Sequence, residues 1–331
     1  MKRVNAITDV RGIEVGHAQN EEALTGCTAI ICRKGAVAGV DVRGGAPGTR
    51  ETDLLNPVNL VEKIHAIVLA GGSAFGLDAA SGVMRYLEEE KIGFNTGVAK
   101  VPIVPSAILF DLNIGRADVR PDSAMGYRAA TSASSDVPPE GNVGVGMGAS
   151  VGKMFGLGLA MKAGVGTASM NIGGGVVLGT LVAVNAWGDV IDPQTNQIIA
   201  GLRSGKVGPL HVGKKDYFAD TLSMMKSTIG RNMLRLTSRA NTVIGVVATN
   251  AKLTKAQATK VAQMAQDGIA RTIRPAHTML DGDVIFALST GTRKADVSSV
   301  GVFAAEVMAE AILRAVKIAK PVGELPGLNN S

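Results

Sequence analysis

The chain has 331 residues, of which 46% are hydrophobic and 19% charged, so it can bury a large core and does not have the composition of a disordered protein. Its 34 basic and 28 acidic residues give a net charge of +6 that forms no run or stripe, and aromatic residues make up only 3%, which excludes the usual patterns of nucleic-acid binding. The 42 glycines indicate tight turns and close backbone contacts.

The first third of the chain predicts strands separated by glycine turns and followed by a helix. The strands are expected over residues 27–35, 36–45 and 66–72, and the helix over residues 73–91 with Ser73 as its N-cap. In the middle of the chain, residues 141–153 and 165–192 read as buried strands in which glycine lets layers approach closely.

The character of the sequence changes twice in the last third. Residues 192–240 are polar, basic and weakly periodic, which is typical of an exposed excursion. At Asn241 a β-branched run begins that predicts a central strand. We then expect a helix from Thr254, a strand over residues 283–291, and a final helix from about Ser299.

The two cysteines and an uncharged stretch of the chain indicate the cellular compartment to expect. Cys27 and Cys32 lie on one predicted strand and would point to opposite faces, so they are not expected to pair. Residues 163–188 carry no charge but are interrupted by glycine and asparagine, so we do not read them as a membrane span. The N-terminus has no apolar signal region, and no Cys or His pair has metal-ligand spacing. A reduced, cytoplasmic protein without metal or organic cofactor, nucleic acid or membrane partner is therefore expected.

Thr242 heads the predicted central strand directly after the polar excursion. If the bond between Asn241 and Thr242 were cut, one residue would supply both a hydroxyl nucleophile and an α-amine, whose unperturbed pKa of about 7.7–8.0 lets it take the hydroxyl proton. From the residues alone, a threonine that simply opens a strand is the better interpretation. The same holds for His277, whose neighbours Thr278, Asp281 and Asp283 are most simply explained as a capped turn.

Long motifs change this interpretation, because they resemble the family of L-aminopeptidase/D-esterases and β-peptidyl aminopeptidases, often called the DmpA family. The resemblance runs over nearly the whole chain. It is carried by GIEVGHAQ from Gly12, TGCTAIICRKGAVAGVDVRGGAPGTRETDLL from Thr25, HAIVLAGGSAFGLDAASGVMRYLEE from His65, KVPIVPSAILFDL from Lys100, GNVGVGMGASVGK from Gly141, LVAVNAWGDVID from Leu181, NTVIGVVATNA from Asn241 and HTMLDGDVIFALSTG from His277.

The resemblance implies a single α/β domain over residues 1–331. Its fold would be a four-layer αββα sandwich, similar to N-terminal-nucleophile hydrolases but with the connectivity of the DmpA and ornithine acetyltransferase proteins. It further implies that a precursor cuts itself into an α chain, 1–241, and a β chain, 242–331, and that such pairs form homo-oligomers, commonly tetramers. Characterised members begin the β chain with serine, whereas this chain has Thr242 in that place.

The resemblance also assigns site residues. Asn185, which ends the run LVAVN, corresponds to a contributor to the oxyanion hole. Alternation along that run places Val182 and Val184 on one face and Asn185 on the other. The family has a hydroxyl residue and an acidic residue in the loop that here reads HTMLDGD. Thr278 is the candidate hydroxyl, and the acidic role is open between Asp281 and no equivalent; His277 is a further candidate in the same loop.

The implied function is a self-processing aminopeptidase or amidase-esterase. It would release N-terminal amino acids from small peptides, amides or esters through an acyl-enzyme on Thr242, with no metal or cofactor. One alternative is an acyltransferase of the ornithine acetyltransferase type, in which an amine rather than water resolves the acyl-enzyme. Another is a non-catalytic binding protein of the same fold.

Overall fold

The computed structural model describes residues 3–213, 216–233 and 241–330. Its centre is a nine-stranded sheet in the order β10-β11-β16-β18-β2-β4-β7-β3, with β1 paired to β2. Neighbouring strands run antiparallel except for the parallel pairs β16–β18 and β4–β7. The strands are β1 (Glu14–Asn20), β2 (Thr25–Val42), β3 (Thr49–Arg50), β4 (Lys63–Ala70), β7 (Ser106–Ile108), β10 (Val165–Asn171), β11 (Val177–Asn185), β16 (Thr242–Ala251) and β18 (Val284–Arg293).

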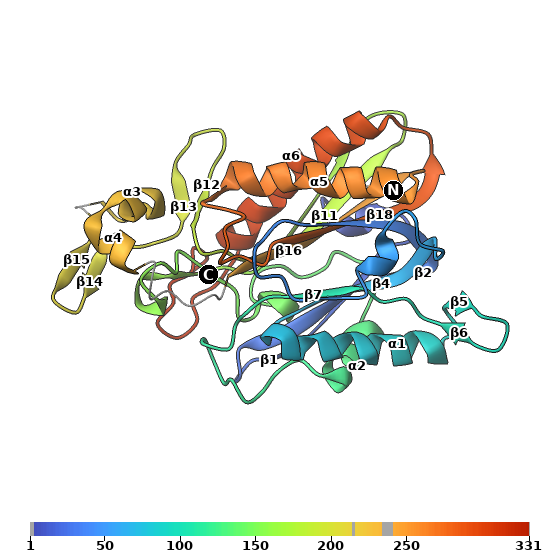
Figure 1. Cartoon of the computed structure of the whole chain (residues 1–331), viewed down its shortest axis with the longest axis horizontal. Coiled ribbons are helices and arrows are strands. Elements are labelled where there is room, and N and C mark those ends of the chain that lie inside the picture. The colour runs from blue at the N-terminus through green and yellow to red at the C-terminus, as the bar shows by residue number, and fades with distance from the viewer. Residues whose placement is uncertain (1–2, 214–215, 234–240, 331) are drawn as a thin grey trace.

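Helices cover the outer faces of the two halves of this sheet, as Figure 1 shows. One pair of helices packs on β10, β11 and β18, and the other packs on β1 and β4. A third apolar layer lies between the two halves of the sheet and includes Ile30, Leu69, Ile244 and Phe286. The predicted four-layer αββα arrangement is thus confirmed. The helices are α1 (Ala79–Glu89), α2 (Ser123–Thr131), α5 (Lys255–Thr272) and α6 (Val297–Lys317).

Side-chain alternation along the central strands builds these layers. On β11, Val182 and Val184 enter the core beneath α5 and α6, whereas Leu181 and Ala183 enter the middle layer. Because successive side chains of a strand point to opposite faces, each central strand serves both cores at once. The predicted alternation of side chains along β11 is confirmed. Asn185, which ends this strand, therefore lies between two buried apolar layers.

The two strands expected over residues 27–35 and 36–45 are one strand, β2, and that prediction was wrong. The glycine that suggested a turn, Gly35, has a φ of +70°, and the pairing of β2 with β4 shifts register between Ile31 and Ala36. The glycine therefore allows a bulge and not a reversal. As a result, β2 pairs with β4 and with β18, and it joins the two halves of the sandwich into one hydrogen-bonded sheet.

Two other local predictions were wrong. Residues 141–153 are not a strand: a short 3-10 helix, Gly144–Gly146, precedes the two-residue strand β8 (Ser150–Val151). A Cβ on Gly144 would lie 2.4 Å from the Thr28 hydroxyl, so the glycines here serve close approach. Ser73 is not the N-cap of a long helix, because it has a φ of +55° and opens a 3-10 turn before α1 begins at Ala79.

The helix predicted from Thr254 is confirmed in detail. The Thr254 hydroxyl accepts a hydrogen bond from the backbone N–H of Gln257, and the Gln257 side chain accepts one from the N–H of Thr254. This reciprocal capping explains why α5 begins at Lys255. The last helix begins at Val297, close to the predicted start, with the Asp296 carboxylate as its cap. No helix in the described part of the chain is long and apolar enough to cross a membrane.

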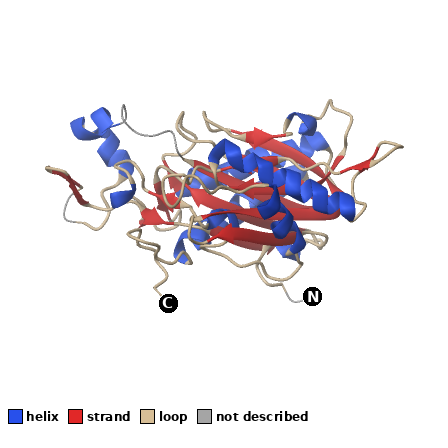
Figure 2. Ribbon diagram, turned by 90° about the horizontal axis from the view of Figure 1, so that it is seen from below, coloured by secondary structure: helices blue, strands red, loops and turns tan. Residues whose placement is uncertain are grey.

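The described residues of the excursion after residue 192, up to 213 and from 216 to 233, are folded and only partly exposed, which corrects the sequence-based expectation. The excursion projects from the sandwich as a hairpin and two short helices (Figures 1 and 2). Its base is buried: Leu202 and Val212 pack with Met154 and Trp187. The smaller elements of the chain are β5 (Phe94–Asn95), β6 (Lys100–Val101), β9 (Met161–Lys162), β12 (Asp189–Ile191), β13 (Ile198–Ala200), β14 (Gly205–Val207), β15 (Leu210–Val212), α3 (Thr221–Lys226), α4 (Thr228–Met233) and β17 (Ile273–Arg274).

Candidate active site

The two residues with the strongest predicted roles are neighbours across the central sheet. Thr242 is the first residue of β16, and its partner in the antiparallel pairing with β11 is Asn185, the last residue of that strand. Both are buried, with 4% and 0% of their surfaces exposed. Antiparallel pairing therefore brings together two residues that are far apart in the sequence.

The peptide bond between Asn241 and Thr242 has a polar setting that suits its own cleavage. The Thr242 hydroxyl donates a hydrogen bond to the Asn241 carbonyl oxygen at 2.5 Å. The backbone N–H of Gly282 donates to the same oxygen at 2.9 Å. A fixed N–H on a carbonyl oxygen is the geometry that stabilises the negative charge of a tetrahedral intermediate. The nucleophile and an oxyanion donor thus meet at one carbonyl.

Gly282 was not identified from the sequence, although it lies in the quoted DGD motif. A Cβ at this position would lie 2.8 Å from the Thr242 hydroxyl oxygen and 2.8 Å from the carbonyl oxygen of Ala46. Atoms do not approach a Cβ this closely without displacement, so the glycine leaves room for the nucleophile. Sequence patterns did not reveal Gly282, because Thr242 and Ala46, which approach it closely, lie in segments distant from it in the sequence.

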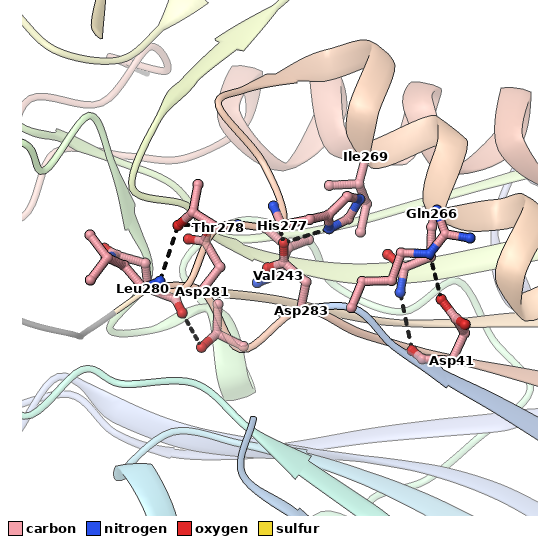
Figure 3. A network of polar contacts seen from close by, with 12 residues as sticks. Asp41, Val243, Gln266, Ile269, His277, Thr278, Leu280, Asp281 and Asp283 are labelled. Carbon is pink, nitrogen blue, oxygen red and sulfur yellow. Dashed lines mark hydrogen bonds and ion pairs between the residues drawn. The ribbon is translucent and has the colours of Figure 1, made fainter. Parts of the chain in front are cut away.

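The loop between β17 and β18 supplies two carboxylates to the site (Figure 3). The N–H and the hydroxyl of Thr278 both donate to Oδ2 of Asp281, at 2.8 and 2.6 Å. The Thr278 hydroxyl also accepts a hydrogen bond from the N–H of Leu280 at 3.1 Å. The hydroxyl of Thr278 is therefore engaged with Asp281 and not with the nucleophile. The backbone of Asp281 forms a parallel bridge with Asn241, which brings this residue beside the Asn241–Thr242 bond.

The second carboxylate, Asp283, connects the loop to the strand of the nucleophile. Its Oδ1 accepts a hydrogen bond from the N–H of Val243 at 2.8 Å. Its Oδ2 accepts hydrogen bonds from the N–H and from Nδ1 of His277, at 3.1 and 2.9 Å. In the sequence Asp283 was noted only as a neighbour of His277. The structure places its carboxylate on the backbone of Val243, the residue that follows Thr242.

Lys153 is a buried lysine that sequence reasoning missed. Its ammonium donates to the backbone oxygen and to Oδ1 of Asn185, at 3.0 and 2.7 Å. The N–H of Ser150 donates to the same Oδ1 at 3.1 Å. The signal was a single cation in the apolar, glycine-rich motif GNVGVGMGASVGK. A lysine that must be buried needs acceptors, and here Asn185 supplies two of them.

These contacts fix the orientation of the Asn185 side-chain amide. With its oxygen held by Lys153 and Ser150, its NH₂ group donates to the carbonyl oxygen of Phe110 at 2.9 Å. An amide nitrogen carries two hydrogens, so one N–H is used in this contact and a second is left for another acceptor. Among the described contacts, the hydrogen bond to the Asn241 carbonyl oxygen from a backbone N–H comes from Gly282, whereas the Asn185 amide donates to Phe110.

Burial shifts the pKa values of two of these groups toward neutral pH. The pKa of Asp281 is raised to about 6, chiefly by burial and then by the negative charge of Asp283. The pKa of Lys153 is lowered to about 7 by burial, against the opposing effects of Asp281 and Asp111. Groups with such pKa values can exchange protons near neutral pH, which is what general acid–base catalysis requires.

The described residues offer no metal centre: across 3–213, 216–233 and 241–330, no three His, Cys, Asp or Glu side chains are grouped so as to hold an ion. The groups gathered around the Asn241–Thr242 bond are a hydroxyl, two carboxylates, an ammonium and backbone N–H donors. This set can carry out nucleophilic acyl transfer with protein groups alone.

Sequence comparison finds relatives along the whole chain. The model of Peptidase family S58 matches residues 5–328. A protein named as an uncharacterized aminopeptidase of Mycobacterium tuberculosis is 43% identical over 346 residues, which cover 98% of this chain and 96% of that protein. A 6-aminohexanoate-oligomer endohydrolase of Kocuria sp. is 31% identical over 322 residues, which cover 93% of this chain and 85% of the relative.

Structure comparison finds the same fold in two aminopeptidases. The β-aminopeptidase of Burkholderia sp. matches with a TM-score of 0.68 and 24% identity, covering 99% of this chain and 91% of the other. The L-aminopeptidase D-Ala-esterase/amidase of Ochrobactrum anthropi, described as a variant of the Ntn hydrolase fold, matches with a TM-score of 0.70 and 20% identity over 98% and 91%. The expected similarity to N-terminal-nucleophile hydrolases is therefore confirmed.

Proposed function

The chain belongs to peptidase family S58 and is a hydrolase, and from this premise we propose that it is a self-processing aminopeptidase and amidase-esterase with Thr242 as its nucleophile. The observation that carries the proposal is the contact of the Thr242 hydroxyl with the Asn241 carbonyl, whose oxygen also receives the Gly282 N–H. The comparisons do not favour the acyltransferase alternative.

Self-cleavage begins with attack of Thr242 Oγ1 on the carbonyl carbon of Asn241. The ionised carboxylate of Asp281 takes the hydroxyl proton, and the Gly282 N–H stabilises the oxyanion. The bond from carbon to the Thr242 nitrogen then breaks, the nitrogen receives the proton, and an ester remains. Water hydrolyses the ester to a carboxylate on Asn241 and the free hydroxyl of Thr242, whose amine was released in the preceding step. Lys153 in its cationic form holds Asn185 beside the nucleophile.

The mature reaction reuses the same hydroxyl on a substrate carbonyl. The new α-amine of Thr242, with an unperturbed pKa of about 7.7–8.0, takes the hydroxyl proton and returns it to the leaving amine or alcohol. Water then releases the acyl group. The names of the relatives support amide substrates of short, linear amino-acyl chains, since they include aminopeptidases and an endohydrolase of 6-aminohexanoate oligomers.

The remaining parts of the proposal concern assembly and compartment. We propose one α/β domain processed into residues 1–241 and 242–331, with pairs of the two chains assembled into a homo-oligomer of the tetrameric kind that the family resemblance implies. A reducing, cytoplasmic setting is supported by Cys27 and Cys32, which are both buried and unpaired on opposite faces of β2.

Intact-mass measurement of the purified protein tests the proposal most directly. We expect two fragments whose masses sum to that of the full chain plus one water, because hydrolysis of one peptide bond adds one water. N-terminal sequencing of the smaller fragment should begin Thr242-Val243-Ile244. A protein that remains whole after prolonged incubation would contradict self-processing.

The rate of self-cleavage should depend on the ionisation of Asp281. Its pKa is raised from 3.8 to about 6, so the carboxyl takes up its proton as the pH falls through about 6 and can then no longer accept one from Thr242. We expect the cleavage rate to fall about tenfold per pH unit below that point. The measurement follows the disappearance of full-length chain, made by cell-free synthesis and shifted to each pH.

The control for this dependence is Asp281→Asn, which has nearly the same shape but cannot accept a proton. We expect this variant to cleave slowly at every pH, without the acid limb. A wild-type rate that stays constant from about pH 5 to pH 8 would rule out Asp281 as the proton acceptor.

A further inference from the structure

His277 has an unusual backbone conformation directly beside the site. Its φ is +57°, in the left-handed region that bulky side chains rarely adopt. Such a conformation costs free energy and persists only where surrounding contacts hold it. Here the contacts are clear, because the N–H and Nδ1 of His277 both bind the same oxygen, Oδ2 of Asp283.

The tautomer of the imidazole follows from this contact. Oδ2 of Asp283 already accepts the backbone N–H of His277, so we place a hydrogen on Nδ1, which donates to the same oxygen. The other ring nitrogen, Nε2, is buried and has no hydrogen-bond partner in the described structure. The tautomer with its hydrogen on Nδ1 therefore satisfies Asp283 without leaving a buried donor unpaired at Nε2.

Asp283 transmits this contact to the nucleophile. Its other oxygen accepts the N–H of Val243, the residue that follows Thr242. The chain of contacts therefore runs from the imidazole through one carboxylate to the first peptide unit of β16 (Figure 3). The next residue of the turn, Thr278, holds the second carboxylate, Asp281, through its N–H and hydroxyl. One turn thus fixes both acidic groups.

We infer that His277 is a positioning residue of this site: its contact through Nδ1 orients Asp283, and thereby holds the Val243 peptide so that the Thr242 hydroxyl stays on the Asn241 carbonyl. The inference rests on the proposed function and assigns a role that the reaction scheme above does not require. His277 does not touch the scissile carbonyl in the described contacts, so it acts through Asp283.

Loss of the imidazole should also change the pH at which Asp281 takes up its proton. The three N–H donors to Asp283, from Val243 and twice from His277, hold both of its carboxylate oxygens in place. The negative charge of Asp283 raises the pKa of Asp281 and Lys153 lowers it, so both effects depend on where these groups lie. When His277 no longer holds Asp283, the pH at which Asp281 takes up its proton should therefore move.

Three variants separate the imidazole from the backbone. His277→Gly relieves the positive φ and removes the donor. His277→Asn tolerates the left-handed conformation and places an amide N–H where Nδ1 lies. His277→Ala removes the donor and keeps the unfavourable φ. His211→Asn, at an exposed position of β15, is the matched control for loss of a histidine elsewhere.

The measurement is the pH profile of self-cleavage, with a thermal unfolding curve for each variant. We expect His277→Gly to cleave about tenfold more slowly, with its acid limb displaced from that of the wild type. His277→Ala should be at least as slow. His277→Asn should recover a rate within about threefold of the wild type and the wild-type acid limb. His211→Asn should match the wild type.

Three results would overturn the inference. His277→Gly with the wild-type rate would show that the side chain has no role. A slow His277→Gly with an unmoved acid limb would show a merely structural role. Failure of His277→Asn to rescue would show that the Nδ1 donor is not what matters. A wild-type chain that is never cut would overturn the proposed function, and this inference with it, before any variant is compared.

Discussion

Thr242→Ala protein is expected to remain a single uncut chain and to hydrolyse no amide or ester substrate. The hydroxyl is the attacking group in both reactions, and without self-cleavage the α-amine never forms. Removal of a nucleophile of this kind typically costs about 10⁶-fold in rate. The fold should survive, since the substitution removes only a hydroxyl and a methyl group from the start of β16. Intact mass and hydrolysis of an amino-acyl p-nitroanilide measure the two effects.

Thr242→Ser is the matched control, because it keeps the hydroxyl and loses only a methyl group. It should still process and still hydrolyse the substrate, within about tenfold of the wild type. If Thr242→Ala protein were cut at the same bond, an external protease would be responsible and the self-processing mechanism would be abandoned.

Gly282→Ala should slow self-cleavage by about 10²-fold or more, although it adds only one methyl group. The new Cβ would lie 2.8 Å both from the Thr242 hydroxyl oxygen and from the Ala46 carbonyl oxygen, so at least one of them must move. The Gly282 N–H, which binds the Asn241 carbonyl oxygen at 2.9 Å, would move with it. The nucleophile and the oxyanion donor are thus disturbed together. The fraction of full-length chain over time gives the rate.

Gly158→Ala is the matched control, because a Cβ at this glycine meets nothing within 4 Å. It should process at the wild-type rate and unfold at the wild-type temperature. If Gly282→Ala also cleaved within a few fold of the wild type, the close approach seen in the structure would have no consequence for the reaction, and Gly282 would lose its role as a donor.

The site was only partly visible in the sequence. The strand start at Thr242 and the alternation along the run that ends at Asn185 were predicted, because strand periodicity is local. Their contact could not be predicted, since it depends on the antiparallel pairing of β11 with β16. The role of Asp281 was left open in the sequence analysis, and the structure places this residue beside Asn241. The hydroxyl of Thr278 donates a hydrogen bond to Asp281.

Lys153 and Gly282 were missed for the same physical reason. The role of Lys153 follows from burial against Asn185, and that of Gly282 from the room it leaves for Thr242. Neither burial nor close approach between distant segments leaves a periodic mark in a sequence. The prediction of a turn at Gly35 was wrong for a related reason. A glycine with positive φ can form either a turn or a bulge, and the pairing of β2 with β4 makes it a bulge inside β2.

By itself the sequence determined the elements whose signals are local: the alternating central strands, the capped helix α5, the separation of Cys27 from Cys32 and the abrupt start of β16. Only the tertiary structure decided which groups meet at the Asn241–Thr242 bond and how burial and Asp283 raise the pKa of Asp281. It also decided that the two halves of the sandwich share β2. Local signals depend on the backbone preferences of a few consecutive residues, whereas a site is made of contacts between segments that folding alone brings together.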